Sequence, residues 1–175
     1  GLAMGLAYGR QLTNLFSFGV NVRYVRERIA RYDSDNLVFD MGMVYHTGFR
    51  SLRLGGYIQN FGVDSKYLYD TFKMPMIFRL GLAGEVLGSE SERNRITLAV
   101  EALHPSNYSE RIHVGAEYSF NHVLFFRAGY KFNYDLGGLS LGLGLQLPAA
   151  ENKIGIDIAY TDFGDLNPVL RFSIN

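Results

Sequence analysis

The sequence predicts an all-β protein, an antiparallel up-and-down transmembrane β-barrel. Three observations predict it: apolar and polar residues alternate, the alternating runs are long, and aromatic residues gather near their ends. Tyr (12), Phe (13) and Gly (20) are abundant among the 175 residues, as in many β-sheets, and Pro (4) is scarce. No apolar run reaches the roughly 18 residues of a spanning α-helix. We expect residues 1–175 to form a single barrel domain, truncated at its N-terminus.

The clearest strands lie in the C-terminal half of the chain. Leucine occupies every odd position of residues 139–147, and small or polar residues occupy the even ones. Residues 111–120, 123–134 and 153–161 alternate in a similar way. Side chains of a strand point to opposite faces in turn, whereas a helix would scatter these positions around its axis. The four segments therefore predict strands with one apolar and one polar face.

The same reading continues through the rest of the chain. We place further strands at residues 2–12, 15–29, 36–48, 51–61, 75–87, 94–104 and 168–175. This makes about eleven strands. Most are about 9–12 residues long; crossing a bilayer takes about 9–11, whereas soluble strands average about 5–6. The strand lengths favour a membrane barrel.

The connections between these strands differ in length. Short turns are expected at 13–14, 48–50, 120–122 and 148–152, and longer connections at 30–35, 62–75, 103–110, 134–138 and 161–168. Short and long alternate, as in outer-membrane barrels with short periplasmic turns. The segment 88–94 is the exception, because it should be short and is not. The alternation predicts a periplasmic C-terminus.

Charged residues recur on the polar face, which would line the lumen. Two readings stay open: a solvated or mutually paired wall, and a selectivity constriction made of a charged ring. We expect several of these residues to pair across neighbouring strands. The predicted lumen-facing charges are Arg23, Glu27, Asp40, Arg53, Arg79, Glu85, Glu101, Glu117, Arg127, Lys131 and Asp157.

Aromatic residues on the other face lie near the predicted strand ends. Transmembrane barrels carry such aromatic girdles at both membrane interfaces. The predicted girdle consists of Tyr8, Phe16, Phe18, Tyr24, Tyr45, Tyr118, Phe120, Phe132, Tyr134, Tyr160, Phe163 and Phe172. A soluble β-sandwich is the alternative, but the polar face carries too much charge for a dry core.

The sequence contains no pattern typical of catalysis or of metal binding. Cys is absent, and the four histidines (His46, His104, His113 and His122) have no metal-ligand spacing. No serine lies beside a base in a nucleophile elbow. Lys plus Arg (17) equals Asp plus Glu (17), so no net charge points to nucleic acid. We expect a non-enzymatic protein without cofactor, metal or nucleic-acid partner.

The connection 62–75 is the longest and is unusually apolar for a solvated loop. It could fold on itself over the barrel rim, contact a partner, or plug the pore. The residues that could do so are Lys66, Tyr67, Leu68, Tyr69, Phe72 and Met74.

Several segments resemble the PorV/PorQ family of outer-membrane barrels. Residues 124–145 (LFFRAGYKFNYDLGGLSLGLGL) and 156–174 (IDIAYTDFGDLNPVLRFSI) are similar to its C-terminal strands. Residues 52–62 (LRLGGYIQNFG), 76–83 (MIFRLGLA) and 112–120 (IHVGAEYSF) are similar to its middle strands. The resemblance implies a FadL-type barrel of about fourteen strands. It also implies type IX secretion, in which the best-known member passes cargo to the surface attachment machinery.

Three functions are compatible with this sequence. The first is a barrel in the bacterial outer membrane that contacts lipid and binds secretion-system proteins or their cargo. The second is a FadL-like channel for hydrophobic small molecules, for which the inward Val44, Tyr57, Ile77, Leu103 and Phe125 could form an apolar path. The third is a soluble β-protein with a lipid in its interior, against which strand length and aromatic residues argue. The resemblance favours the first.

Overall fold

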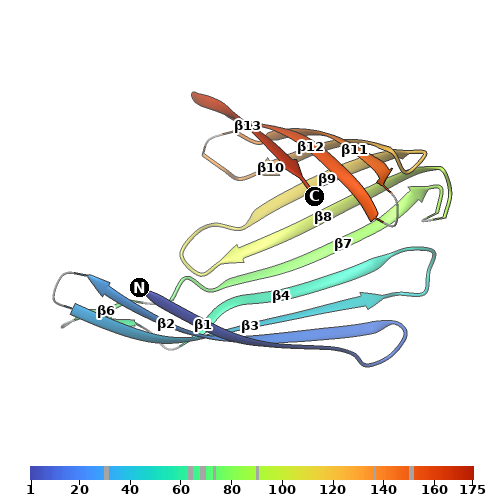
Figure 1. Ribbon diagram of the computed structural model, residues 1–175. Coiled ribbons are helices and arrows are strands. Elements are labelled where there is room, and N and C mark those ends of the chain that lie inside the picture. The colour runs from blue at the N-terminus through green and yellow to red at the C-terminus, as the bar shows by residue number, and fades with distance from the viewer. Residues whose placement is uncertain are drawn as a thin grey trace. The chain divides into compact units, whose positions relative to one another are not determined.

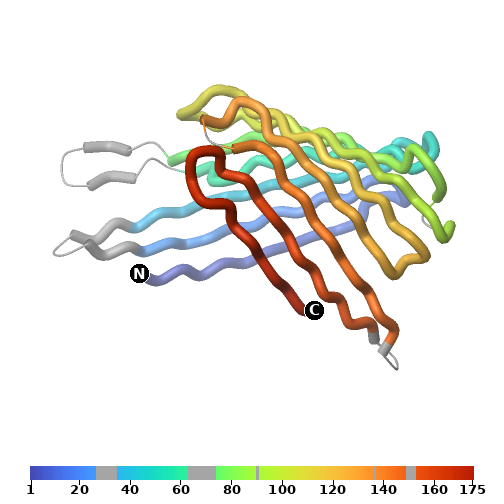
Figure 2. The backbone as a smooth tube through the Cα atoms, turned by 90° about the horizontal axis from the view of Figure 1, so that it is seen from above, coloured from blue at the N-terminus to red at the C-terminus, as the bar shows by residue number. Residues whose placement is uncertain are grey.

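The computed structural model describes residues 1–29, 32–62, 65–67, 70–72, 74–89, 91–135, 137–149 and 152–175. Over these residues the protein is all-β, with eleven antiparallel strands in one up-and-down sheet and no helix (Figure 1). Figure 2 follows the chain through its successive hairpins. Among the described residues, no helix is long and apolar enough to cross a membrane. The predicted all-β class and the predicted antiparallel up-and-down order of about eleven strands are confirmed.

The strands keep the order of the chain, β1-β2-β3-β4-β7-β8-β9-β10-β11-β12-β13, and β5 and β6 form a separate hairpin. Their bounds are β1 (Leu2–Gln11), β2 (Phe16–Ile29), β3 (Tyr32–His46), β4 (Arg53–Gly62), β5 (Ser65–Tyr67), β6 (Asp70–Phe72), β7 (Ile77–Leu87), β8 (Asn94–Pro105), β9 (Arg111–Phe120), β10 (Leu124–Phe132), β11 (Leu139–Ala149), β12 (Asn152–Phe163) and β13 (Leu166–Ile174). In the described sheet, β1 and β13 each pair with one neighbour.

The chain divides into two compact units, which we describe separately. The first unit comprises Gly1–Thr47, Leu54–Leu80 and Leu103–Glu110. The second unit comprises Gly48–Arg53, Gly81–Ala102 and Arg111–Asn175.

In the first unit, the register of β1, β2 and β3 separates apolar from polar side chains. Leu6 lies opposite Val22, and Val22 lies opposite Phe39. One residue earlier on β2, Asn21 lies opposite Asp40. Because neighbouring residues of a strand point to opposite faces, the first row is apolar and the second is polar.

The second unit carries a longer row of the same kind. Tyr118, Phe126, Leu143, Ile158 and Phe172 lie side by side on β9, β10, β11, β12 and β13. All five side chains are exposed, from 36% for Tyr118 to 68% for Phe172. We call the face that bears such rows the apolar face, and the opposite one the polar face.

Burial is inverted relative to a water-soluble protein. Among the described residues, Val38 and Leu103 are the only buried large apolar side chains, and most of the others are exposed. Asp40, Ser119 and Thr161 are buried instead. Soluble proteins rarely expose a continuous apolar surface of this kind, and where one occurs it marks contact with a partner or a membrane.

The predicted alternation of short and long connections is not found. Strand β3 begins at Tyr32 instead of residue 36, and the β2–β3 ladder reaches the pair Ile29–Tyr32. Likewise, β12 and β13 continue to the pair Phe163–Leu166. Polar residues that the sequence predicted as loops thus lie in paired strand ends. At the end of the β2–β3 ladder, for example, Arg26 lies opposite Asp35.

Candidate functional site

The polar face of the sheet gathers most of the predicted lumen-facing charges into three hydrogen-bonded groups. Arg23 and Asp40 lie in the first unit, and Arg53, Glu85, Glu117, Arg127 and Asp157 lie in the second. Arg79 alternates with the exposed Phe78 and Leu80 on β7, so its half-buried side chain lies on the polar side of that strand. The side chain of Glu27 lies outside the described part of the structure.

The first group surrounds Asp40, whose side chain is only 5% exposed. Asn21 Nδ2 donates to Asp40 Oδ2 over 3.0 Å, and Arg23 Nη2 lies 3.0 Å from the same oxygen. The backbone amide of Asn60 donates to Asp40 Oδ1 over 2.9 Å. Strands β2 and β4 thus supply donors to a buried carboxylate of β3, as a buried charge requires.

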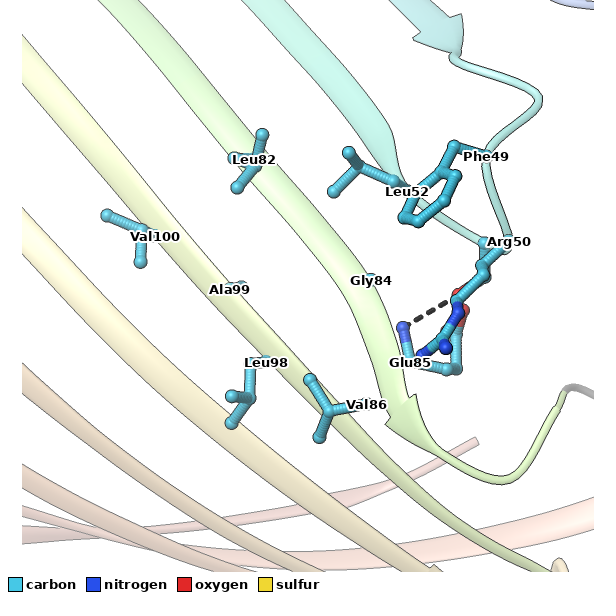
Figure 3. A pocket seen from close by; sticks show the side chains of 11 residues that line it. Phe49, Arg50, Leu52, Leu82, Gly84, Glu85, Val86, Leu98, Ala99 and Val100 are labelled. Atoms are coloured by element: carbon cyan, nitrogen blue, oxygen red, sulfur yellow. Dashed lines mark hydrogen bonds between the residues drawn. The ribbon is translucent and has the colours of Figure 1, made fainter.

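The second group surrounds Glu85, whose side chain is 6% exposed. Arg53 Nη1 donates to Glu85 Oε1 over 3.2 Å, and the hydroxyl of Thr97 lies 3.5 Å from that oxygen. The backbone amide of Glu85 donates to Ser51 Oγ over 2.8 Å, shown as the dashed line in Figure 3. This group ties the start of β4 to β7 and β8.

The third group is a chain of four alternating charges, Arg95, Glu117, Arg127 and Asp157. Arg95 Nη2 lies 3.5 Å from Glu117 Oε1, and Arg127 Nε donates to Glu117 Oε2 over 2.8 Å. Arg127 Nη1 donates to Asp157 Oδ1 over 2.6 Å. The expectation that several of the predicted charged residues pair across neighbouring strands is confirmed at Glu117–Arg127 and at Arg23–Asp40.

Arg95 was absent from the predicted set, although the sequence contains the signal for it. It precedes Glu101 by six residues on the same strand, and residues an even number apart share a face.

Two glycines of β11 make the Arg127–Asp157 contact possible. Strands β10 and β12 are not neighbours, and Gly142 and Gly144 of β11 lie between them. A Cβ added to Gly144 would lie 2.6 Å from Asp157 Oδ1 and 2.9 Å from Arg127 Nη1. The missing side chains therefore leave the space in which the two charges meet.

A further polar group joins Glu101, His113 and Tyr134 in the second unit. His113 Nδ1 lies 3.2 Å from Glu101 Oε2, and His113 Nε2 lies 2.7 Å from the hydroxyl of Tyr134. Because a carboxylate only accepts, Nδ1 donates to Glu101, whereas the donor in the contact between Nε2 and Tyr134 is set by the protonation state of the ring. Lys131 lies opposite His113, with Nζ 5.8 Å from the Tyr134 ring.

The placement of Tyr134 corrects the sequence prediction. Strict alternation after Phe132 would place Tyr134 with the outward aromatic residues. Asn133 takes a left-handed backbone conformation (φ 61°), which ends the alternation. The Tyr134 ring instead lies under Arg111, 4.4 Å from the guanidinium carbon, beside His113.

The other predicted girdle residues lie on strands of the apolar face. The exposed ones are Tyr8, Tyr24, Tyr45, Tyr118, Phe120, Phe132, Tyr160 and Phe172. Phe16, Phe18 and Phe163 are half-buried and lie opposite Tyr45, Met43 and Leu166.

The apolar face of the second unit is hollowed near the β3–β4 connection (Figure 3). This groove has a volume of about 400 Å³. Leu82 and Val86 of β7 line it together with Leu98 and Val100 of β8. Phe49, Arg50 and Leu52 from the connection lie beside these strands in Figure 3.

The residues proposed as an inward apolar path differ in their surroundings. Val44 lies opposite Ser17 on the polar side of the first unit, where Leu103 is also buried. Phe125, in the second unit, lies opposite Ser119 with the Arg127 guanidinium carbon 5.2 Å from its ring centre. A charged side chain thus lies over this aromatic surface.

The segment 62–75 contains the β5–β6 hairpin, in which Ser65 lies opposite Phe72. Met74 is half-buried. The predicted contacts of Leu68 and Tyr69, and of the Lys66, Tyr67 and Phe72 side chains, fall outside the described part of the structure.

One ion pair lies where β8 leads into the following connection. His104 Nδ1 lies 3.1 Å from Glu110 Oε1. The pKa of the Glu110 carboxyl group lies below its usual value, because its own backbone amide and then the charge of His104 stabilise the carboxylate. Among the described residues, no group of three or more His, Asp or Glu side chains is placed to hold a metal ion.

Comparison of the sequence with models of known protein families and with curated proteins finds no match.

Proposed function

We propose that this chain belongs to a β-barrel of the bacterial outer membrane and that its apolar face contacts lipid. The exposed row from Tyr118 to Phe172 carries this proposal, because it continues across five strands without a charged residue. The opposite face holds its charges in pairs, as at Arg127 and Asp157. Lipid would solvate the apolar face, and the polar face would line the interior of the barrel.

Within that membrane, the proposed role is non-enzymatic binding of protein partners in secretion or surface attachment. The segments that resemble the PorV/PorQ family support this role through their order and spacing between residues 52 and 174. The candidate contact segment is 62–75, which presents the β5–β6 hairpin beyond the end of β4. Partners would be secretion-system proteins or their cargo.

The membrane part of the proposal is tested by fractionation of cells that produce the full-length protein. We expect it in the outer-membrane fraction, with a gel mobility that changes on boiling because a folded barrel resists detergent. A soluble protein with unchanged mobility would rule out the membrane assignment.

The partner-binding part is tested by deleting residues 65–72. At equal amounts in the outer membrane, we expect the deletion to reduce delivery of cargo to the cell surface. Deletion of 91–93, in the β7–β8 connection, serves as the control and should leave delivery unchanged. Normal delivery in both variants would remove the role of the 62–75 segment. Loss of hydrophobic small-molecule uptake alone would indicate a channel instead.

A further inference from the structure

The polar face of the second unit contains a hollow of about 520 Å³ whose floor is made of small residues. On the floor, Gly115 lies opposite Gly129, and Gly129 lies opposite Ser140. Ala99, Gly142 and Ala159 complete it. The absence of large side chains here opens space between the group that contains Arg127 and the group that contains His113.

Three arginines line this hollow, each from a different strand. Arg53 comes from β4, Arg95 from β8 and Arg127 from β10, whereas Glu117 is the only acidic residue among the described residues of the lining. The lining thus contains three guanidinium groups, each of which pairs with a carboxylate.

The paired carboxylates lie deeper than two of these arginines. The Glu85 side chain is 6% exposed and that of its partner Arg53 is 37% exposed. Asp157 is 31% exposed and Arg127 is 41% exposed. Each of these two carboxylates is thus less exposed than the arginine that it pairs with.

Arg95 has a hydrogen-bond donor that lacks an acceptor. Its Nε is buried and has no hydrogen-bond partner among the described residues. Its only charged partner described is Glu117, at 3.5 Å, the longest contact in the chain of four charges. A buried donor without a partner is costly unless a water molecule or a ligand supplies the acceptor.

We propose that this hollow binds a small oxyanion, a carboxylate or a phosphate, among Arg53, Arg95 and Arg127. A guanidinium offers five N–H donors in a planar fork, and the described contacts of Arg127 to Glu117 and Asp157 use two of them. Oxyanions supply several acceptor oxygens in a geometry that matches such forks. The volume of the hollow falls within the range of about 300–1,000 Å³ that holds a small molecule. This inference concerns the polar face alone and does not depend on the membrane.

The test is calorimetric titration of the full-length protein, folded in detergent, with inorganic phosphate and with acetate at constant ionic strength. We expect saturable binding with one site per chain. Binding of phosphate alone identifies a phosphorylated ligand, and binding of acetate identifies a carboxylate. If neither anion binds saturably to protein that is folded by circular dichroism, the proposal is overturned.

Two variants locate the site. Arg95→Gln removes the least paired cation and should weaken binding about tenfold, since a hydrogen bond to a charged group contributes this much. Gly115→Leu fills the hollow, because a Cβ there has Ala128 O, at 3.8 Å, as its nearest neighbour. This second variant should weaken binding at least as strongly.

Two substitutions in the first unit are the matched controls. Gly9→Leu adds the same side chain at a glycine with equal clearance, 3.8 Å to Phe18 O. Arg26→Gln removes the charge of an arginine whose side chain is half exposed. Both should bind the anion with wild-type affinity. Equal weakening in controls and site variants would show that the anion binds elsewhere, and would overturn the proposal.

Discussion

Arg127 and Asp157 form an ion pair over the strand that separates them, with Arg127 Nη1 2.6 Å from Asp157 Oδ1. The contact crosses β11 at Gly142 and Gly144, where no side chain stands in the way. A pair of this kind links three strands instead of two.

The first prediction concerns Gly144→Ala. The new methyl group would lie 2.6 Å from Asp157 Oδ1, so the ion pair must separate or the strand must shift. We expect the free energy of unfolding to fall by about 1–3 kcal/mol, as for other overpacked sites. Urea unfolding of the folded protein measures it. Gly9→Ala, where the nearest atom is 3.8 Å away, should change stability by less than about 0.5 kcal/mol. Equal effects would show that the space at Gly144 has no special role.

The second prediction concerns Asp40→Asn, which keeps the shape of the side chain and removes its charge. Arg23 then loses its carboxylate partner at a site where Asp40 is 5% exposed. We expect a loss of about 2–3 kcal/mol in the free energy of unfolding, less than for a fully buried pair because Arg23 is partly solvated. Asp35→Asn, at the exposed Arg26–Asp35 pair, should cost less than about 1 kcal/mol. A smaller loss for Asp40 than for Asp35 would contradict the prediction.

The third prediction compares the two faces of β11. Leu143→Arg places a charge on the apolar face, and Gln146→Arg places the same charge on the polar face. If the apolar face meets lipid, we expect Leu143→Arg to destabilise the protein in lipid vesicles by about 2–4 kcal/mol near the bilayer midplane. Gln146→Arg should change its stability far less. Equal tolerance of both variants would mean that the apolar face does not contact lipid.

The fourth prediction concerns the pH dependence of the His104–Glu110 pair. Folding lowers the pKa of the Glu110 carboxyl group. The contribution of Glu110 to the free energy of unfolding is therefore present above its pKa in the unfolded chain, and it is lost as the pH falls through its pKa in the folded protein. In His104→Ala we expect the pKa of Glu110 to rise and yet to stay below its usual value, since its own backbone amide contributes most. An NMR titration of the Glu110 carboxyl carbon measures this pKa in the wild-type protein and in the variant. His122→Ala is the control and should leave the pKa of Glu110 unchanged. A Glu110 pKa that is the same in His104→Ala as in the wild type would contradict the assignment.

The period of two made the faces of the sheet predictable from the sequence. Leu143 and Gly144 fall on opposite faces in any strand, whatever its partners. The ends of the strands were harder to predict. Charged residues such as Asp35 are typical of loops, and only the cross-strand register shows that Asp35 belongs to a strand. The turn at Asn133 escaped prediction because a single left-handed residue reverses the alternation that follows.

The site itself could be predicted only in part. Sequence reasoning identified Arg127 and Asp157 as residues of one face, but a contact across an intervening strand depends on three registers at once. The hollow lined by Arg53, Arg95 and Arg127 could not be predicted either. Its glycines lie on different strands and come together only through the pairing of those strands. The link between His113 and Tyr134 depends on the turn at Asn133.

Asn60 has a consequence for the segment that follows it. Its backbone amide binds Asp40, and its Nδ2 donates to the carbonyl oxygen of Pro75 over 3.4 Å. Beyond Pro75, the amide of Ser106 donates to Met76 O over 2.9 Å. The Asn60 side chain thus connects the two ends of the segment 62–75. This contact does not involve the residues between those ends. We expect that a tag or a foreign loop can replace the interior of the segment while the sheet keeps its register, because each doubling of loop length costs only about 0.6 kcal/mol of closure entropy.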